Sequence, residues 1–379
     1  MSVDFLTTEQ KAQYGQYACE PNEVQLSRYF HLDESDLAFI ANRRGDKNKL
    51  GFALQLTTVR FLGTFLSDVS QVPTNARVFV GRQLAVKNVA VLADYAQRET
   101  TKREHTALIR RHYGYSEFSD PHWTFRLSRM LYTRAWISNE RPSLMFDFST
   151  AWLIQHKVLL PGATTLSRLI SEIRERSDNR LWRCLSSLPN REQKANLETL
   201  LQVPDGQRTS GFDRFRKGPT TISGPAFNLS VQRYLDLRAF GIHEIDFSHI
   251  PPVRLKNLAR HAGVISMHKI ARMPENKRTA ILLAFAKVYE TVALDDSLDV
   301  LDMLITEIAR DAKNIGRKNR LRTLKDLDRS ALTLAAVCAL LSDEETADEE
   351  LRKAIFIQFP KRHLAESIAT VNSLARPPD

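Results

Sequence analysis

The scarcity of helix-breaking residues and of strand-like runs is the feature that most restricts how this chain can fold. Its 379 residues include only 14 glycines and 15 prolines, below the roughly 12% that the two types reach together in average usage. Uninterrupted runs of Val, Ile and Thr, which favour strands, are also rare. At roughly 150 residues per domain, the length allows two or three domains. The sequence therefore predicts an all-α, multi-domain helical protein.

Glycine and proline are concentrated in residues 204–224, which we expect to form a linker between two helical regions. A weaker break lies near Pro73. These breaks predict a first helical subdomain over residues 1–70, a second helical region over 71–203 and a third over 225–379.

Nothing in the chain is typical of a membrane span or an export signal. The longest apolar run, Leu332–Leu341, is shorter than the roughly 18 residues that a transmembrane helix needs. The N-terminal residues lack the basic region and apolar core of a signal peptide. The three cysteines, Cys19, Cys184 and Cys338, are too few and too far apart for a disulfide framework or a zinc finger. We expect a cytoplasmic protein without membrane contact.

The formal net charge of +10 is unevenly distributed along the chain. Residues 43–141 carry a net charge of +9, whereas residues 1–42 carry −5 and residues 293–379 carry −3. A basic region between acidic ends is typical of a surface that binds a polyanion such as nucleic acid. Surplus lysine and arginine can also serve solubility alone.

The first candidate DNA-binding unit lies close to the N-terminus. Helices are predicted over residues 23–30 and 34–44, joined by a tight turn over 31–33, with Asp33 capping the second helix and Gly45 ending it. This is the geometry of a helix-turn-helix. The basic residues that follow are predicted to hold phosphates, and they are Arg43, Arg44, Lys47 and Lys49. A helical bundle with a solvated basic corner fits the pattern equally well.

The second candidate unit has the stronger pattern. We expect one helix over residues 83–97, a turn over 98–100, and a second helix that opens with a capping box, Thr101 with Glu104, and runs to Tyr113. The inner face is predicted to carry His105, Leu108, Ile109 and His112. The residues predicted to contact DNA bases or phosphates are Lys102, Arg103, Thr106, Arg110 and Arg111, with Ala107 beside them. A solvated helix face would look similar.

The third candidate unit pairs a helix over residues 143–156 with one that starts at Thr164 or Thr165 and continues to Arg176. Its predicted inner face carries Leu166, Leu169, Ile170 and Ile173. The side chains expected to face outward to DNA are Ser167, Arg168, Ser171 and Arg174. Between the second and third units, Arg126, Arg129 and Arg134 are predicted phosphate ligands among aromatic residues that we expect to be core.

The sequence predicts no catalytic or metal-binding residue. Gly206 and Gly211 have the spacing of a phosphate-binding loop, but Phe212 and Asp213 stand where a lysine and a hydroxyl residue are required. The histidines between 243 and 268 do not have metal-ligand spacing. Three aspartates share one helix face and could bind Mg²⁺, namely Asp295, Asp299 and Asp302. Acidic residues in a first helical turn also complement the helix dipole, and we favour either a capped helix or a contact with a partner.

Several long strings resemble the N-terminal and middle parts of the Tn-three-type replicative transposases, the TnpA family. The strings that carry the resemblance are Met1–Thr7, Arg43–Leu56, Ile109–Tyr115, Pro252–Arg260, Lys277–Phe285 and Asp295–Asp299. They are spread over essentially the whole chain.

The resemblance implies that the N-terminal helical domains bind double-stranded DNA at the terminal inverted repeats of a transposon. It implies that residues 225–379 support dimerisation and scaffolding, with a second copy or a full-length transposase as the partner. Family members are longer and carry a C-terminal RNase H-like domain whose Asp, Asp and Glu bind Mg²⁺. We expect this chain to stop before that domain, and therefore to hold no cofactor and perform no catalysis alone.

The predicted function is sequence-specific binding of terminal inverted-repeat DNA in transposition, in the bacterial cytoplasm and associated with the nucleoid. The alternative is a dimerising regulatory fragment that inhibits or scaffolds full-length transposase. A self-contained nuclease is a third class, which metal-dependent cleavage by this chain would indicate.

Overall fold

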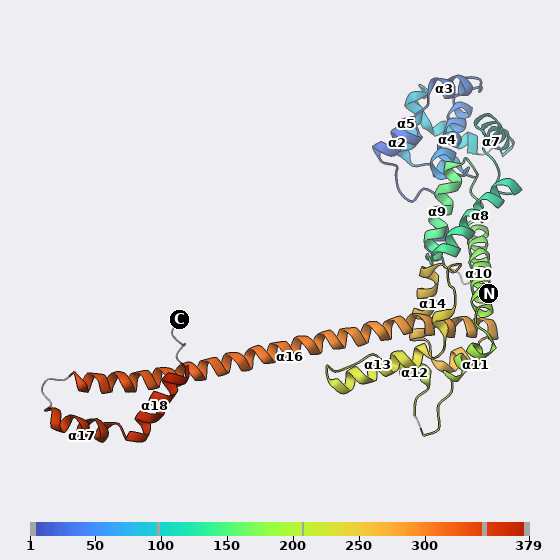
Figure 1. The fold of residues 1–379 in the computed structure, drawn as a ribbon. Coiled ribbons are helices and arrows are strands. Elements are labelled where there is room, and N and C mark those ends of the chain that lie inside the picture. The colour runs from blue at the N-terminus through green and yellow to red at the C-terminus, as the bar shows by residue number, and fades with distance from the viewer. Residues whose placement is uncertain (1–4, 97–98, 207, 343–346, 375–379) are drawn as a thin grey trace. The chain divides into compact units, whose positions relative to one another are not determined.

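The computed structural model describes residues 5–96, 99–206, 208–342 and 347–374, which form eighteen α-helices and three short 3₁₀-helices (Figure 1). Within these residues the β-type pairing is limited to one isolated parallel bridge, between Ser116 and Val158. The predicted all-α class is confirmed.

Contacts divide the chain into two compact units. Unit 1 comprises Met1–Arg216 and Leu237–Glu290, and unit 2 comprises Lys217–Asp236 and Thr291–Asp379. The boundaries predicted at residues 70, 203 and 224 stay predictions.

The first core of unit 1 surrounds α4 (Asp46–Leu62), in which every residue from Leu50 to Val59 is buried. A helix that is buried on all sides needs apolar or hydrogen-bonded side chains all round, as here. Gly45 (φ 79°) and Gly63 (φ 74°) adopt positive φ angles at its two ends, which only glycine reaches without strain. The helices packed around α4 are α2 (Glu23–Tyr29), α3 (Glu34–Ala41), α5 (Thr74–Gln83), α6 (Leu92–Ala96) and α7 (Glu99–Tyr113).

The second core of unit 1 lies between three helices, α8 (Pro121–Ile137), α9 (Pro142–Gln155) and α10 (Ala163–Ser187). Residues of the short α1 segment (Thr8–Gln13) and its flanks also join it through Leu6 and Tyr14. The predicted inner face of α10 is confirmed: Leu166, Ile170 and Ile173 are buried, and Leu169 packs against the same cluster.

The remaining helices of unit 1 pack on the N-terminal part of the long helix α16. These helices are α11 (Arg191–Thr199), α12 (Gly211–Phe215), α14 (Pro252–Val264) and α15 (Met267–Ala271), and the part of α16 (Glu275–Leu341) that belongs to unit 1 is residues 275–290. Phe212 of α12 is fully buried against Phe285, with the ring centroids 4.5 Å apart. Residues 211–215 therefore form a helix, with Phe212 and Phe215 buried, inside the segment that the sequence predicts to be a linker.

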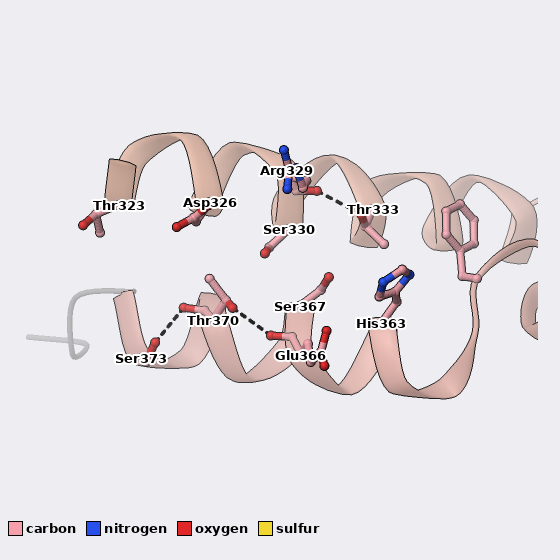
Figure 2. A pocket seen from close by; sticks show the side chains of 11 residues that line it. Thr323, Asp326, Arg329, Ser330, Thr333, His363, Glu366, Ser367, Thr370 and Ser373 are labelled. Carbon is pink, nitrogen blue, oxygen red and sulfur yellow. Dashed lines mark hydrogen bonds between the residues drawn. The ribbon is translucent and has the colours of Figure 1, made fainter. Parts of the chain in front are cut away.

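Unit 2 contains residues 224–236 of α13 (Gly224–Arg238), residues 291–341 of α16, α17 (Asp348–Gln358) and α18 (Lys361–Leu374). Arg233 of α13 pairs with Asp296 of α16 at 2.5 Å. Figure 2 shows α18 lying along α16, with Ser367 and Thr370 facing Ser330 and Asp326.

Several predicted helix bounds are wrong. Residues 83–97 do not form one helix, because α5 ends at Gln83 and the chain turns at Ala85 (φ 57°) before the 3₁₀-helix Val89–Val91 and α6. Helix α7 begins at Glu99, so Thr101 lies within it and does not cap it. Three parts of the predictions lie outside the described residues: residue 97 at the end of the predicted helix, residue 98 in the predicted turn, and Met1–Asp4 of the first resembling string.

Candidate nucleic-acid interface

Helix α7 is attached to the neighbouring elements of unit 1 by polar contacts along its inner face. The Lys102 ammonium donates a hydrogen bond to the Ser67 carbonyl at 2.9 Å and pairs with Glu99 at 2.6 Å. Nδ1 of His105 lies 3.1 Å from the hydroxyl of the buried Tyr95. Ile109, on the same face of α7, is fully buried and adds an apolar contact. The rotational setting of α7, and hence the face it presents to solvent, is determined by this inner face.

Hydrogen bonds to the buried Asp36 also attach α7 to the rest of unit 1. The Tyr113 hydroxyl donates to the Asp36 carboxylate at 2.8 Å, and the Arg60 guanidinium donates to both Asp36 oxygens at 2.8 and 2.6 Å. Burial acts to raise the pKa of Asp36, but the bonds from Arg60 and Tyr113 outweigh it and hold that pKa below its ordinary value. Burial, with a smaller contribution from the nearby Arg43 charge, lowers the pKa of His105 to about 4. Asp36 is therefore ionised and His105 neutral at pH 7.

The outer face of α7 carries the predicted contact residues, with one correction. Arg103 and Arg111 are exposed, and among the described residues neither has a carboxylate within ion-pair distance. Arg110 pairs with Glu117 at 2.5 Å, and the half-buried Thr106 hydroxyl donates to the Arg103 carbonyl. The prediction for Lys102 is wrong, because its side chain is buried under the helix.

The predicted inner face of α7 is also only partly right. His105 and Ile109 are buried, whereas Leu108 is 36% exposed. His112 is exposed and stacks on Phe39, with the ring centroids 3.9 Å apart.

The corner between α3 and α4 presents fewer free cations than the sequence predicts. Arg43 is half-buried, with its guanidinium over the rings of Phe39 and Phe52, so the expectation that it clasps phosphate is not supported by its position. Lys47 pairs with Asp94 at 3.7 Å. Arg44 is exposed and Lys49 is half-exposed, and these two can reach a phosphate.

On α10 the predicted outward row divides in two. Arg168 is exposed and lies 3.9 Å from Glu172, and Ser171 is half-buried. The Ser167 hydroxyl oxygen is buried. The prediction that Arg174 faces outward is wrong, because its guanidinium donates to the Glu140 carbonyl, and burial lowers its pKa.

Helix α8 adds two exposed cations, and α10 adds others that the sequence prediction missed. Arg129 is exposed, and the exposed Arg126 guanidinium lies 5.1 Å from the Trp123 ring centroid. The extra residues belong to the second half of α10, which continues past the predicted end at Arg176, and they are Arg176, Arg180 and Arg183. The buried Leu181 and Leu185 continue the apolar periodicity there, and that signal was available in the sequence.

The part of the chain that the structure describes contains no group of three His, Cys, Asp or Glu side chains placed to hold a metal ion. Asp295, Asp299 and Asp302 are exposed on α16. In the same described residues, no helix combines the length and the apolar character needed to cross a membrane.

Comparison with known sequences gives relatives along the whole chain. A family described as "Domain of unknown function (DUF4158)" matches residues 5–173. The transposase for transposon gamma-delta of Escherichia coli K12 is 60% identical over 377 residues, which cover 100% of this chain and 38% of that protein. The transposase for transposon Tn501 of Pseudomonas aeruginosa is 25% identical over 95% of this chain and 36% of its own length. The chain thus spans less than two-fifths of these curated relatives.

Proposed function

Because the chain belongs, over its whole length, to the family of Tn-three-type transposases, we propose that it binds the terminal inverted repeats of its transposon in DNA transposition. We place sequence reading on the outer face of α7. Its neighbours in unit 1 then hold the DNA backbone.

The observation that carries this proposal is the division of α7 into a fixed inner face and a basic outer face. Lys102, His105 and Ile109 are buried, so the helix cannot rotate without breaking their contacts. Arg103 and Arg111 are thereby held in solvent without a carboxylate partner among the described residues. An arginine in this position can donate two hydrogen bonds to a guanine edge in the major groove.

Backbone contacts are assigned to exposed or half-exposed cations outside α7. These are Arg44, Lys49, Arg126, Arg129 and Arg168. Contacts to phosphate fix the register of a protein on DNA but carry no sequence information. Several such modules are needed to read an extended repeat, because one recognition helix covers only a few base pairs.

The test is binding and footprinting of the purified chain on a duplex that contains the terminal repeat, with a duplex of shuffled sequence as the control. We expect protection confined to the repeat, tighter binding to the repeat than to the control, and no change when EDTA is added. Equal affinity for both duplexes would contradict the proposal. With Mg²⁺ we expect neither nicking nor joining, since catalysis is proposed to require more than this chain.

A second candidate function, a dimerising regulatory chain, is favoured by an exposed apolar row on α16. The row, called the seam here, repeats at alternating steps of four and three residues and consists of Leu294, Leu298, Leu301, Ile305, Ile308, Ala312 and Ile315. Its exposed fractions run from 37% at Leu294 to 66% at Ile308. This is the heptad spacing of a two-stranded coiled coil.

The seam predicts that a second copy of the chain, or the same segment of a longer transposase, packs against it. In analytical ultracentrifugation, Ile305→Asp with Ile308→Asp should convert a dimer to a monomer. Leu332→Asp is the control, because Leu332 is 71% exposed on α16 but lies outside the seam. An unchanged mass for the seam variant would contradict this candidate.

A further inference from the structure

A short stretch of α16 is far more basic than the region around it. Between Arg310 and Lys325 the sequence has seven lysines and arginines and one acidic residue, Asp311. All seven basic residues are exposed. This stretch, called the basic segment here, therefore carries a net charge of +6 inside a region that is acidic on average.

Most of the basic residues lie on the half of α16 opposite Ile308 of the seam, but Lys318 lies at the edge of that half and Arg322, seven residues after Ile315, lies on the seam side. Arg317 follows Ile308 by nine residues, about two and a half turns, which places the two on opposite sides of the helix. Asp326 follows Ile308 by about five full turns and lies on the seam side. Figure 2 shows that this seam side is where α18 packs, with Asp326 and Ser330 facing it. Neither α18 nor a partner on the seam would cover the basic side.

These charges are not compensated within the described residues. Arg310 lies 3.6 Å from Glu307, and it alone of the seven has an ion pair there. Lys313 and Arg317 are four residues apart, as are Lys318 and Arg322, so the like charges of each pair repel along the helix. A polyanion laid along this side would remove the repulsion.

We propose that the basic segment is a second DNA-contacting surface, one that grips duplex phosphates without reading sequence. The inference rests on the proposed function, since it assumes that the chain binds DNA. The segment is about 22 Å long, and duplex DNA carries on the order of 13 phosphate charges over that length. It has no carboxylate besides Asp311 and no side chain fixed by a neighbouring element, which suits backbone contact better than base readout.

The test is a triple variant, Arg317→Gln, Lys318→Gln and Arg320→Gln, compared with the wild-type chain on the terminal-repeat duplex and on the shuffled duplex. Glutamine has a helix propensity close to that of lysine and arginine, and circular dichroism checks that the helix remains. The matched control removes three exposed cations elsewhere in unit 2 through Arg352→Gln, Lys353→Gln and Arg362→Gln.

We expect the triple variant to lose affinity for both duplexes by the same factor and to show a weaker salt dependence. If all three side chains contact phosphate, the ratio of wild-type to variant affinity falls by about 40-fold between 50 and 200 mM salt, from a slope of about −0.9 per contact. Losses no larger than those of the control variant would overturn the inference, as would binding of an acidic protein segment that DNA does not displace.

Failure of this inference is separable from failure of the proposed function. If the triple variant binds like wild type while the repeat is still preferred over the shuffled duplex, only the basic segment is excluded. If the triple variant weakens both duplexes but the wild-type chain has no preference for the repeat, the basic segment stands and sequence reading fails.

Discussion

Acidification from pH 7 to pH 5 should destabilise unit 1 through His105. Burial and the Arg43 charge lower the pKa of His105 to about 4 in the folded chain, against 6.5 for a free imidazole. Between these values the unfolded chain binds a proton that the folded chain does not, so stability falls as the pH falls. For a folded pKa of about 4, the free energy of unfolding decreases by about 2 kcal/mol between pH 7 and pH 5.

Urea unfolding followed by tryptophan fluorescence measures this loss, because all four tryptophans lie in unit 1. The informative quantity is the difference in free energy between pH 7 and pH 5 for each protein, which does not depend on the variant's starting stability. In His105→Gln that difference should be about 2 kcal/mol smaller than in wild type. His122→Gln, which removes an exposed imidazole from α8, is the control. If His105→Gln keeps the full wild-type pH dependence, His105 is not the source of the loss of stability.

Two other predictions concern packing and salt. A Cβ at Gly51 would lie 2.5 Å from ring atoms of the buried Tyr95, so Gly51→Ala should lower the free energy of unfolding by about 1–3 kcal/mol. Gly316→Ala is the control, since no atom lies within 4 Å of a Cβ at that position. It should stabilise α16 by about 0.5–1 kcal/mol. Equal changes in the free energy of unfolding for the two substitutions, measured by urea unfolding, would show that the contact with Tyr95 has no effect. The affinity for DNA should fall with salt at a slope of about −0.9 for each phosphate contacted; an affinity that is independent of salt in a fluorescence titration would exclude a polyanion surface.

The fold class and the local helix signals could be predicted because they depend on neighbouring residues. Asp33 caps α3 as predicted, since its carboxylate accepts from the amide of Asp36 at 2.7 Å. The buried face of α10 follows directly from the spacing of Leu166, Ile170 and Ile173. These features need no information from distant parts of the chain.

The wrong predictions for Lys102, Arg174 and the turn at Ala85 concern features that the local sequence pattern does not reveal. Lys102 looks like a surface cation, but its partner is the carbonyl of Ser67, 35 residues away. Arg174 likewise donates a hydrogen bond to the Glu140 carbonyl, so the outward face of α10 is less basic than the spacing predicts. The turn at Ala85 has a positive φ on a residue that does not signal one.

The basic segment of α16 was missed for a different reason. Charges counted over residues 293–379 average to −3, which hides the +6 between residues 310 and 325. Net charge summed over a shorter stretch of the sequence reveals the basic segment. The contrast between the seam and the basic side is a helical periodicity, so it too was present in the sequence.

Paired affinities on two duplexes test whether the outer face of α7 reads base sequence. Arg103→Ala, Arg111→Ala and Lys49→Ala are each measured on the terminal-repeat duplex and on the shuffled duplex at one salt concentration. The two α7 variants should lose about 1–3 kcal/mol on the repeat, about 5- to 150-fold in affinity, and much less on the shuffled duplex. Lys49→Ala should weaken binding to both duplexes about equally. Equal losses on the two duplexes for Arg103→Ala and Arg111→Ala would show that α7 grips only the backbone and does not read sequence.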